Sequence, residues 1–211
     1  MSIKHKDKFR AKKEWAVRID RPEEIHGIPS LYYTDEEIEK YAKSGGMKKT
    51  QENITYRILE LLNIEKHKKI LDIGCGVGYT TNVYQNEGYE VIGLDVLPKM
   101  LEKAKAKGLN VVKGDMRNLK DIFKEKEFDA VVSASALQWL KAKEDIEKVA
   151  SGINYILKNK GKIVIQFYPK SYEELVSTAK IFKKCGFEGE IITDNPDKSI
   201  KRVIYLVMKK I

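Results

Sequence analysis

The chain has 211 residues, of which 42% are hydrophobic and 34% charged, a composition typical of a soluble protein with one full-sized core. No apolar run approaches the roughly 20 residues needed to cross a bilayer, and the first residues contain no apolar region of a secretory signal. We therefore expect neither a membrane protein nor a secreted protein. The net charge of +9 is compatible with an anionic partner.

The two cysteines, Cys75 and Cys185, lie far apart and form no pair with the spacing of metal ligands. We therefore predict a reduced, cytoplasmic protein without a structural metal. The abundance of Lys and Glu is typical of a thermophile.

The positive charge is concentrated at the two ends of the sequence. Residues 1–13 and residues 198–211 each carry a net charge of +5, which leaves the middle of the chain close to neutral. Basic ends of this kind favour contact with a polyanion, and solvated surface lysines are the alternative. Charge alone does not decide between the two.

Residues 1–20 are predicted to form a basic N-terminal arm, and residues 21–66 a helical lid segment. Loop signals occur at Arg21-Pro22-Glu23 and at Gly27-Ile28-Pro29. A capping box, Thr34–Glu37, predicts a short helix toward Lys43.

Ser44-Gly45-Gly46 is predicted to break that helix. A longer helix is predicted from about Met47 to Asn63, because Ile54, Ile58 and Leu62 recur with helical spacing. Both helices precede the glycine-rich motif described next, and we expect them to fold over a ligand cleft.

The core domain is predicted to span residues 67–211, where strands and helices alternate. Five strands are predicted at Lys69–Ile73, Glu90–Leu94, Asn110–Lys113, Phe128–Ser133 and Lys162–Phe167. The first strand runs into Gly-Cys-Gly-Val-Gly at residues 74–78, and helix-compatible residues follow. This order marks the first βα unit of a nucleotide-binding α/β domain, in which Gly74 and Gly76 let the backbone approach a ligand closely.

Two further strands, Glu190–Thr193 and Arg202–Met208, end the chain. Only about eight residues separate them, too few for a helical crossover, so we expect them to pair antiparallel. A seven-stranded, mostly parallel sheet with a C-terminal antiparallel hairpin and an N-terminal helical lid is similar to the Rossmann-like fold of class I S-adenosylmethionine methyltransferases.

Residues at the strand ends indicate the cofactor. Asp95 follows the second strand, where a carboxylate can accept both ribose hydroxyls, although it equally fits a dinucleotide or a helix N-cap. Asp115 and Met116 follow the third strand and suit an adenine, with the carboxylate on the amine and the thioether on the ring. Together with the hairpin, these features favour S-adenosylmethionine, with S-adenosylhomocysteine as product. The predicted cofactor contacts are Asp72, Gly74, Gly76, Asp95, Val96, Met100, Asp115, Met116 and Ser133.

The fourth strand is followed by Ser133-Ala-Ser-Ala-Leu-Gln-Trp139, which lacks the Asn/Asp-Pro-Pro-aromatic motif of amine-directed methyltransferases. Neither cysteine is placed as a nucleophile, and no histidine follows a strand. We therefore expect an acceptor that needs no deprotonation, such as guanine N7, and catalysis by proximity and alignment.

Four residues at the carboxyl ends of strands are predicted to position the acceptor: Gln138, Trp139, Tyr168 and Pro169. Trp139 and Tyr168 would enclose a flipped base, and Gln138 would hydrogen-bond its edge. A core position with a satisfied N–H is the alternative for Trp139.

Several motifs resemble the family of small-subunit rRNA guanine-N7 methyltransferases, over about residues 21–208. The most specific are Ser133-Ala-Ser-Ala-Leu-Gln-Trp-Leu140 and Gln166-Phe-Tyr-Pro169, supported by Leu71–Gly76 and Gly114–Met116. The resemblance implies an archaeal-type member that methylates guanine N7 in small-subunit rRNA. It also implies partnership with a small zinc-binding activator protein that several methyltransferases share.

One departure from the family affects the cofactor site. Gly46 stands where the family usually has an arginine suited to the cofactor's carboxylate. Two alternatives therefore stay open: a methyltransferase that acts on a small metabolite, and a non-catalytic ribosome-assembly factor that keeps the fold for binding.

Overall fold

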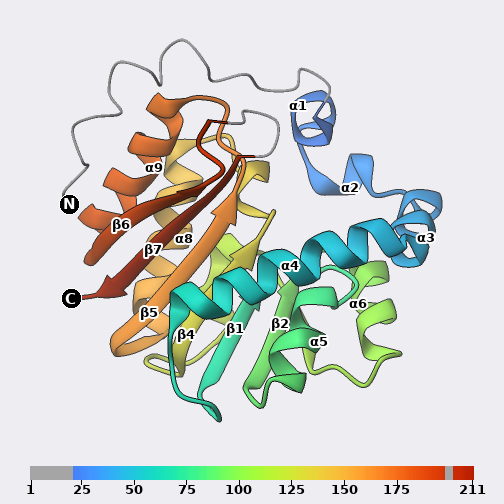
Figure 1. Ribbon diagram of the computed structural model, residues 1–211, viewed down its shortest axis with the longest axis horizontal. Helices are drawn as coiled ribbons and strands as arrows, with labels where there is room; N and C mark the ends of the chain where they lie inside the picture. The colour runs from blue at the N-terminus through green and yellow to red at the C-terminus, as the bar shows by residue number, and fades with distance from the viewer. Residues whose placement is uncertain (1–20, 198–201) are drawn as a thin grey trace.

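The computed structural model describes residues 21–197 and 202–211 (Figure 1). The predicted basic arm, residues 1–20, lies outside this part of the chain, as do residues 198–201. A seven-stranded sheet forms the centre, in the order β3-β2-β1-β4-β5-β7-β6. Its strands are β1 (Lys69–Ile73), β2 (Glu90–Asp95), β3 (Val111–Lys113), β4 (Phe128–Ala134), β5 (Leu157–Phe167), β6 (Phe187–Asp194) and β7 (Val203–Lys210).

The strands β1 to β5 are parallel, and β7 is antiparallel to both of its neighbours, β5 and β6. This arrangement confirms the predicted sheet with its antiparallel C-terminal hairpin. Because β1 to β5 run in one direction, their carboxyl ends meet at one edge of the sheet, which is where ligands bind in such folds.

Helices cover both faces of the sheet. On one face, Ile58 and Leu62 of α4 (Gly45–Leu62) pack on Ile70 of β1, beside α5 (Tyr79–Asn86). On the other face, Leu71 belongs to the cluster that α8 (Lys143–Ile156) and α9 (Tyr172–Lys184) complete. Neighbouring residues of β1 therefore point to opposite faces, and both faces are apolar, as expected for a buried parallel strand. Figure 1 shows α4 crossing in front of the strands.

Between residue 21 and β1, the structure has four helices. The first two, α1 (Pro22–His26) and α2 (Pro29–Tyr32), are short and stand where loops were predicted. Each begins with a proline, whose fixed φ suits the first helical position, so the residues that signal a loop here start a helical turn instead. The third, α3 (Asp35–Lys43), begins at the predicted cap, where Thr34 Oγ1 accepts a hydrogen bond from the amide of Glu37 at 3.3 Å.

The break between α3 and α4 is confined to Ser44, which corrects the prediction that the two glycines also lie outside the helices. Ser44 Oγ accepts a hydrogen bond from the amide of Met47 at 3.2 Å, so Gly45 and Gly46 form the first turn of α4. The cap fixes this turn despite the low helix propensity of glycine.

Two strands are longer than predicted. β5 starts at Leu157 rather than Lys162, and β6 starts at Phe187 rather than Glu190. The beginning of β5 is an exposed polar run with a register irregularity against β4, and it carries no apolar alternation that a sequence pattern could reveal.

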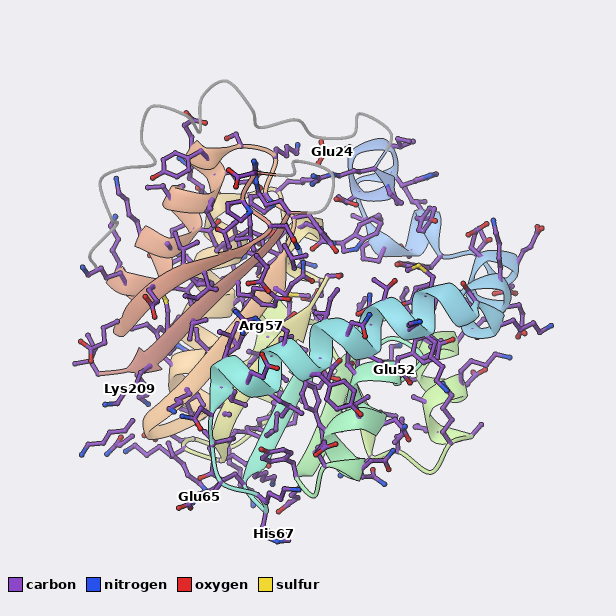
Figure 2. The ribbon with its side chains drawn as sticks, viewed as in Figure 1. Glu24, Glu52, Arg57, Glu65, His67 and Lys209 are labelled. Carbon is purple, nitrogen blue, oxygen red and sulfur yellow. The ribbon has the colours of Figure 1, made fainter. Side chains whose placement is uncertain are left out.

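The N-terminal helices are tied to the core by polar contacts. Arg57 of α4, which is labelled in Figure 2, forms two hydrogen bonds with the carboxylate of Asp194 in β6, at 3.0 and 3.1 Å. Tyr79 Oη donates to the backbone oxygens of Tyr41 at 3.1 Å and Ala42 at 2.8 Å. Within residues 21–197 and 202–211, no helix is long and apolar enough to cross a membrane.

Candidate functional site

A cleft of about 1350 Å³ opens at the carboxyl ends of the parallel strands. One side is built from residues that follow β1, β2, β3, β4 and β5, and the N-terminal helices supply the opposite wall. Single small-ligand sites usually measure about 300–1,000 Å³. The cleft is therefore large enough for a cofactor together with part of an acceptor.

The glycine-rich loop after β1 forms the floor of the cleft. Gly74 has φ of 77°, and a Cβ added to it would lie 2.3 Å from Cβ of Ala136 in the turn after β4. Only glycine fits between the two turns, which leaves a bare backbone along the cleft. Gly74 and Gly76 both line it.

Two predicted cofactor contacts, Asp72 and Ser133, lie beneath this floor and are not among the residues that line the cleft, so their contacts with a cofactor stay predictions. Asp72 is buried, and its Oδ2 accepts hydrogen bonds from Thr80 Oγ1 at 2.6 Å and Thr81 Oγ1 at 2.7 Å. Burial raises its pKa to about 6. Ser133 is also buried and donates its hydroxyl to the backbone oxygen of Ile73 at 2.9 Å. Both residues hold the loop in place from below.

Asp95 lies where β2 enters the cleft. One carboxylate oxygen accepts from the amide of Gly76 and the other from the amide of Leu97, each at 2.9 Å. Each oxygen keeps a second lone pair for a ligand hydroxyl. Burial raises the pKa of Asp95, while the two amides oppose this shift. Val96 and Met100 line the cleft beside it.

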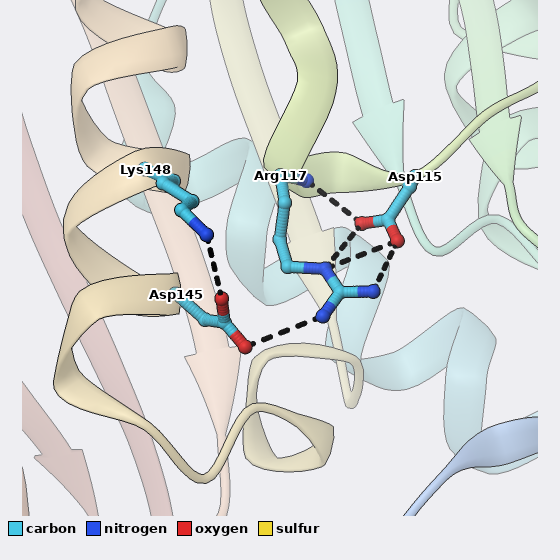
Figure 3. Close-up of polar contacts among 4 residues, drawn as sticks. All are labelled: Asp115, Arg117, Asp145 and Lys148. Carbon is cyan, nitrogen blue, oxygen red and sulfur yellow. Dashed lines mark hydrogen bonds and ion pairs between the residues drawn. The ribbon is translucent and has the colours of Figure 1, made fainter.

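Asp115 and Met116 line the cleft at the end of β3, and Arg117 holds Asp115 (Figure 3). Arg117 Nε lies 3.0 Å from both carboxylate oxygens of Asp115, and Nη1 lies 3.3 Å from Asp145 Oδ2. The hydrogen bonds from Arg117 lower the pKa of Asp115. Asp115 is therefore a fixed, charged acceptor at the cleft wall, as an adenine amine would require.

A strained turn follows β4. Ser135 has φ of 57°, a left-handed conformation that costs about 1–2 kcal/mol for a residue with a Cβ. The fully buried Gln166 of β5 holds it: its Oε1 accepts from the amide of Ser135 at 3.0 Å and from Oγ at 2.9 Å. The carbonyl of Ser135 in turn accepts from Nε2 of Gln138 at 3.0 Å. Gln138 Oε1 is buried without a partner among the described residues.

Aromatic side chains form the acceptor end of the cleft. Trp139 contacts Tyr33 and Tyr32, with ring centroids 5.9 and 6.2 Å apart. Tyr168 lies under the guanidinium of Arg21, whose Nη1 donates to the backbone oxygen of Tyr168 at 2.7 Å. Gln138, Trp139 and Tyr168 line the cleft, whereas Pro169 does not. The contacts of these residues with a bound base remain predictions.

Three residues that line the cleft were not predicted as site residues: Arg21, Gln51 and Ser135. Nor was Gln166, which holds the turn at Ser135 from below. Gln51 is a polar residue on the apolar stripe of α4, four residues before Thr55 and seven before Ile58. A polar side chain on a buried face is a signal that the sequence does carry. The role of Gln166 depends on the turn across the sheet, which no local pattern reveals.

Among the described residues, neither the cysteine in the cleft nor a histidine is placed to remove a proton from an acceptor. Burial raises the pKa of the Cys75 thiol well above its usual value, so it is not an activated nucleophile. The described histidines, His26 and His67, do not line the cleft. Among the described residues, no cluster of His, Cys, Asp or Glu has the arrangement of a metal site.

Comparisons with known proteins match this geometry. Residues 71–165 match a family described as a methyltransferase domain. An 18S rRNA guanine-N7 methyltransferase from Saccharomyces cerevisiae is 35% identical over 85% of this chain and 68% of its own length.

Two solved structures are also similar. A phosphoethanolamine N-methyltransferase from Haemonchus contortus, bound to S-adenosylhomocysteine, is 25% identical over 86% of this chain and 47% of its own, with a TM-score of 0.63. A methyltransferase from Haloferax volcanii, in complex with the Trm112 activator, has the same fold with a TM-score of 0.63, at 18% identity over 82% of this chain and 97% of its own.

The fold and the cleft thus define a class I S-adenosylmethionine-dependent methyltransferase. The cleft fits this cofactor, because three suitable features line it: the carboxylate of Asp95, the backbone of Gly74 and Gly76, and the apolar side chain of Met116. Within that class, the chain belongs to the family of 18S rRNA guanine-N7 methyltransferases.

Proposed function

We propose that this enzyme methylates N7 of a guanine in small-subunit rRNA. The observation that carries the proposal is that the aromatic rings of Trp139 and Tyr168 and the amide of Gln138 line one end of the cleft, where no described histidine lies and the Cys75 thiol is not activated. A ring nitrogen with a free lone pair needs no proton acceptor, whereas an amine or hydroxyl acceptor would have to lose a proton. The S. cerevisiae relative is named for this reaction.

S-Adenosylmethionine supplies a methyl group on a positively charged sulfur that is already activated. The protein then has to align the guanine with this methyl group and exclude water. In the proposed arrangement, Trp139 and Tyr168 hold the base, and Gln138 hydrogen-bonds its edge. Gly74, Gly76, Asp95, Met100, Asp115 and Met116 hold the cofactor.

The proposal extends to a partner protein. The similar H. volcanii methyltransferase is seen with the Trm112 activator, and we propose that this chain also acts with a small zinc-binding activator. We also propose that the enzyme is an archaeal-type, cytoplasmic member of its family from a thermophile. The Lys- and Glu-rich composition supports the thermophilic source.

Methyl transfer from radiolabelled cofactor to isolated small ribosomal subunits that lack the modification tests the function. We expect label in the small-subunit RNA, more of it when the activator is present, and cleavage of that RNA at N7-methylguanine by aniline chemistry. Label on small metabolites alone would favour the metabolite methyltransferase. An enzyme that binds the cofactor but labels no RNA would favour the non-catalytic assembly factor.

A further inference from the structure

Gln51 is a buried glutamine in the wall that α4 contributes to the cleft. Its side chain lines the cleft, and only 7% of the residue surface is exposed. None of the described residues hydrogen-bonds its amide, although its backbone oxygen accepts from Thr55 Oγ1 at 2.7 Å. Since amides at buried positions normally have hydrogen-bond partners, this one is suited to a polar ligand in the cleft.

The position of Gln51 in the cleft indicates which end of the cofactor it would contact. Asp95 and Met116 mark the adenosine side of the cleft, at the ends of β2 and β3. In the sheet order, β1 and β4 lie on the other side, and α4 packs over them through Ile54 and Ile58. With the adenosine at β2 and β3, the amino-acid end of the cofactor extends toward the wall that holds Gln51.

The charges along the cleft give this end no basic partner. Among the described residues, the cations that line the cleft lie outside α4 and the glycine loop: Arg21, Arg117, Lys141 and Arg202. Arg117 is bonded to Asp115, Lys141 pairs with Glu24, and Arg21 bonds to the backbone of Tyr168. Neither α4 nor the glycine loop contributes a lining cation, so uncharged donors have to bind the carboxylate.

We propose that the side-chain amide of Gln51 donates a hydrogen bond to the carboxylate of S-adenosylmethionine. The amino end of α4 lies on the same wall, since Met47 in its first turn also lines the cleft. The positive end of the dipole of this 18-residue helix adds to the attraction. The inference concerns the cofactor alone and does not depend on the identity of the RNA substrate.

Replacing Gln51→Met tests this, because Met keeps the size and helix propensity of the side chain. Calorimetry compares two ligands: S-adenosylhomocysteine, and 5′-deoxy-5′-methylthioadenosine, which has the adenosine and sulfur but no amino-acid end. We expect the affinity for S-adenosylhomocysteine to fall roughly ten- to hundredfold, the range for a hydrogen bond to a charged group, and that for methylthioadenosine to stay unchanged. Equal losses for both ligands, or no loss for either, would overturn the proposal.

The matched control is Asn53→Met, two residues further along α4 at an exposed position, which should change neither affinity. A second variant tests the proposal by gain. A Cβ at Gly46 meets nothing closer than Ser44 Oγ at 4.0 Å, so the backbone there accepts a residue with a side chain. Gly46→Arg should tighten binding of S-adenosylhomocysteine, restore it in Gln51→Met, and leave methylthioadenosine unaffected. A Gly46→Arg variant that does not distinguish the two ligands would place the carboxylate elsewhere and contradict the proposal.

Discussion

Among the single residues, Asp95 is the predicted cofactor contact with the most fixed geometry, because two backbone amides hold both of its carboxylate oxygens in the cleft. We predict that Asp95→Ala weakens binding of S-adenosylhomocysteine by roughly 1–3 kcal/mol, the cost of leaving buried partners unpaired. Methylthioadenosine should lose the same amount, since it keeps the ribose. Calorimetry with both ligands measures this, and unchanged affinities would exclude the ribose role.

Asp72 gives a pH-dependent prediction. Burial raises its folded-state pKa from 3.8 to about 6, so its protonated form stabilises the fold. This stabilisation is complete below pH 3.8 and is lost as the pH rises through about 6. The shift is about two pKa units at 1.36 kcal/mol each, so the loss approaches about 3 kcal/mol.

Urea unfolding of the wild type and of Asp72→Asn, between about pH 4 and pH 7, measures this effect. The variant has no titrating group at this position, so the wild type should lose stability relative to it as the pH rises. A stability difference that is constant across this range would show that the buried carboxyl does not titrate there.

Most of the site residues predicted from the sequence do line the cleft, because Asp95, Asp115 and Gln138 lie at or shortly after the ends of strands that meet at one edge. The sequence did not distinguish the residues that line the cleft from Asp72 and Ser133, which lie next to them in the same motifs. Which side chain points into the cleft and which lies under the loop depends on the local path of the backbone, and Thr80 and Thr81 hold Asp72 below.

At the level of elements, α5 joins the lid to the core. Tyr79 Oη donates to the last turn of α3, whereas the buried Tyr84 Oη, on the same helix, forms no hydrogen bond with α3. We predict that Tyr79→Phe destabilises the contact between lid and core by about 1 kcal/mol, the net value of such a hydrogen bond.

Hydrogen exchange at residues 35–50 measures the effect, and Tyr84→Phe is the matched control. The control removes a hydroxyl that makes no hydrogen bond with α3, so it should leave protection of α3 unchanged. If both variants exchanged alike in α3, the two hydrogen bonds of Tyr79 would not hold the lid.

Strands and helices could be predicted from the sequence where they carry a clear pattern of apolar residues. β1 to β4 have bounds within a residue of the prediction, because each is a short apolar run. The start of β5, with its exposed Lys158, Asn159 and Lys160, has no such pattern and is fixed only by pairing across the sheet. The prolines of α1 and α2 signal a loop or a helix start equally well.

For the whole molecule, the distribution of charge makes a prediction about RNA binding. Residues 1–13 contain six Lys or Arg residues. If they contact phosphates, replacing them with a Gly/Ser segment of equal length should reduce the slope of log affinity against log salt by up to about four units. Filter binding of small-subunit rRNA at several salt concentrations measures this, and an unchanged slope would assign these cations to the solvated surface.

The proposed acceptor is a ring nitrogen, N7 of guanine, which the cleft would align without removing a proton. Small subunits reconstituted with RNA that contains 7-deazaguanine test it directly, because a carbon replaces N7 while the rest of the base is kept. We expect radiolabelled methyl groups to enter subunits made in parallel with guanine and to be absent from the 7-deazaguanine subunits. Equal labelling of both would contradict this proposal.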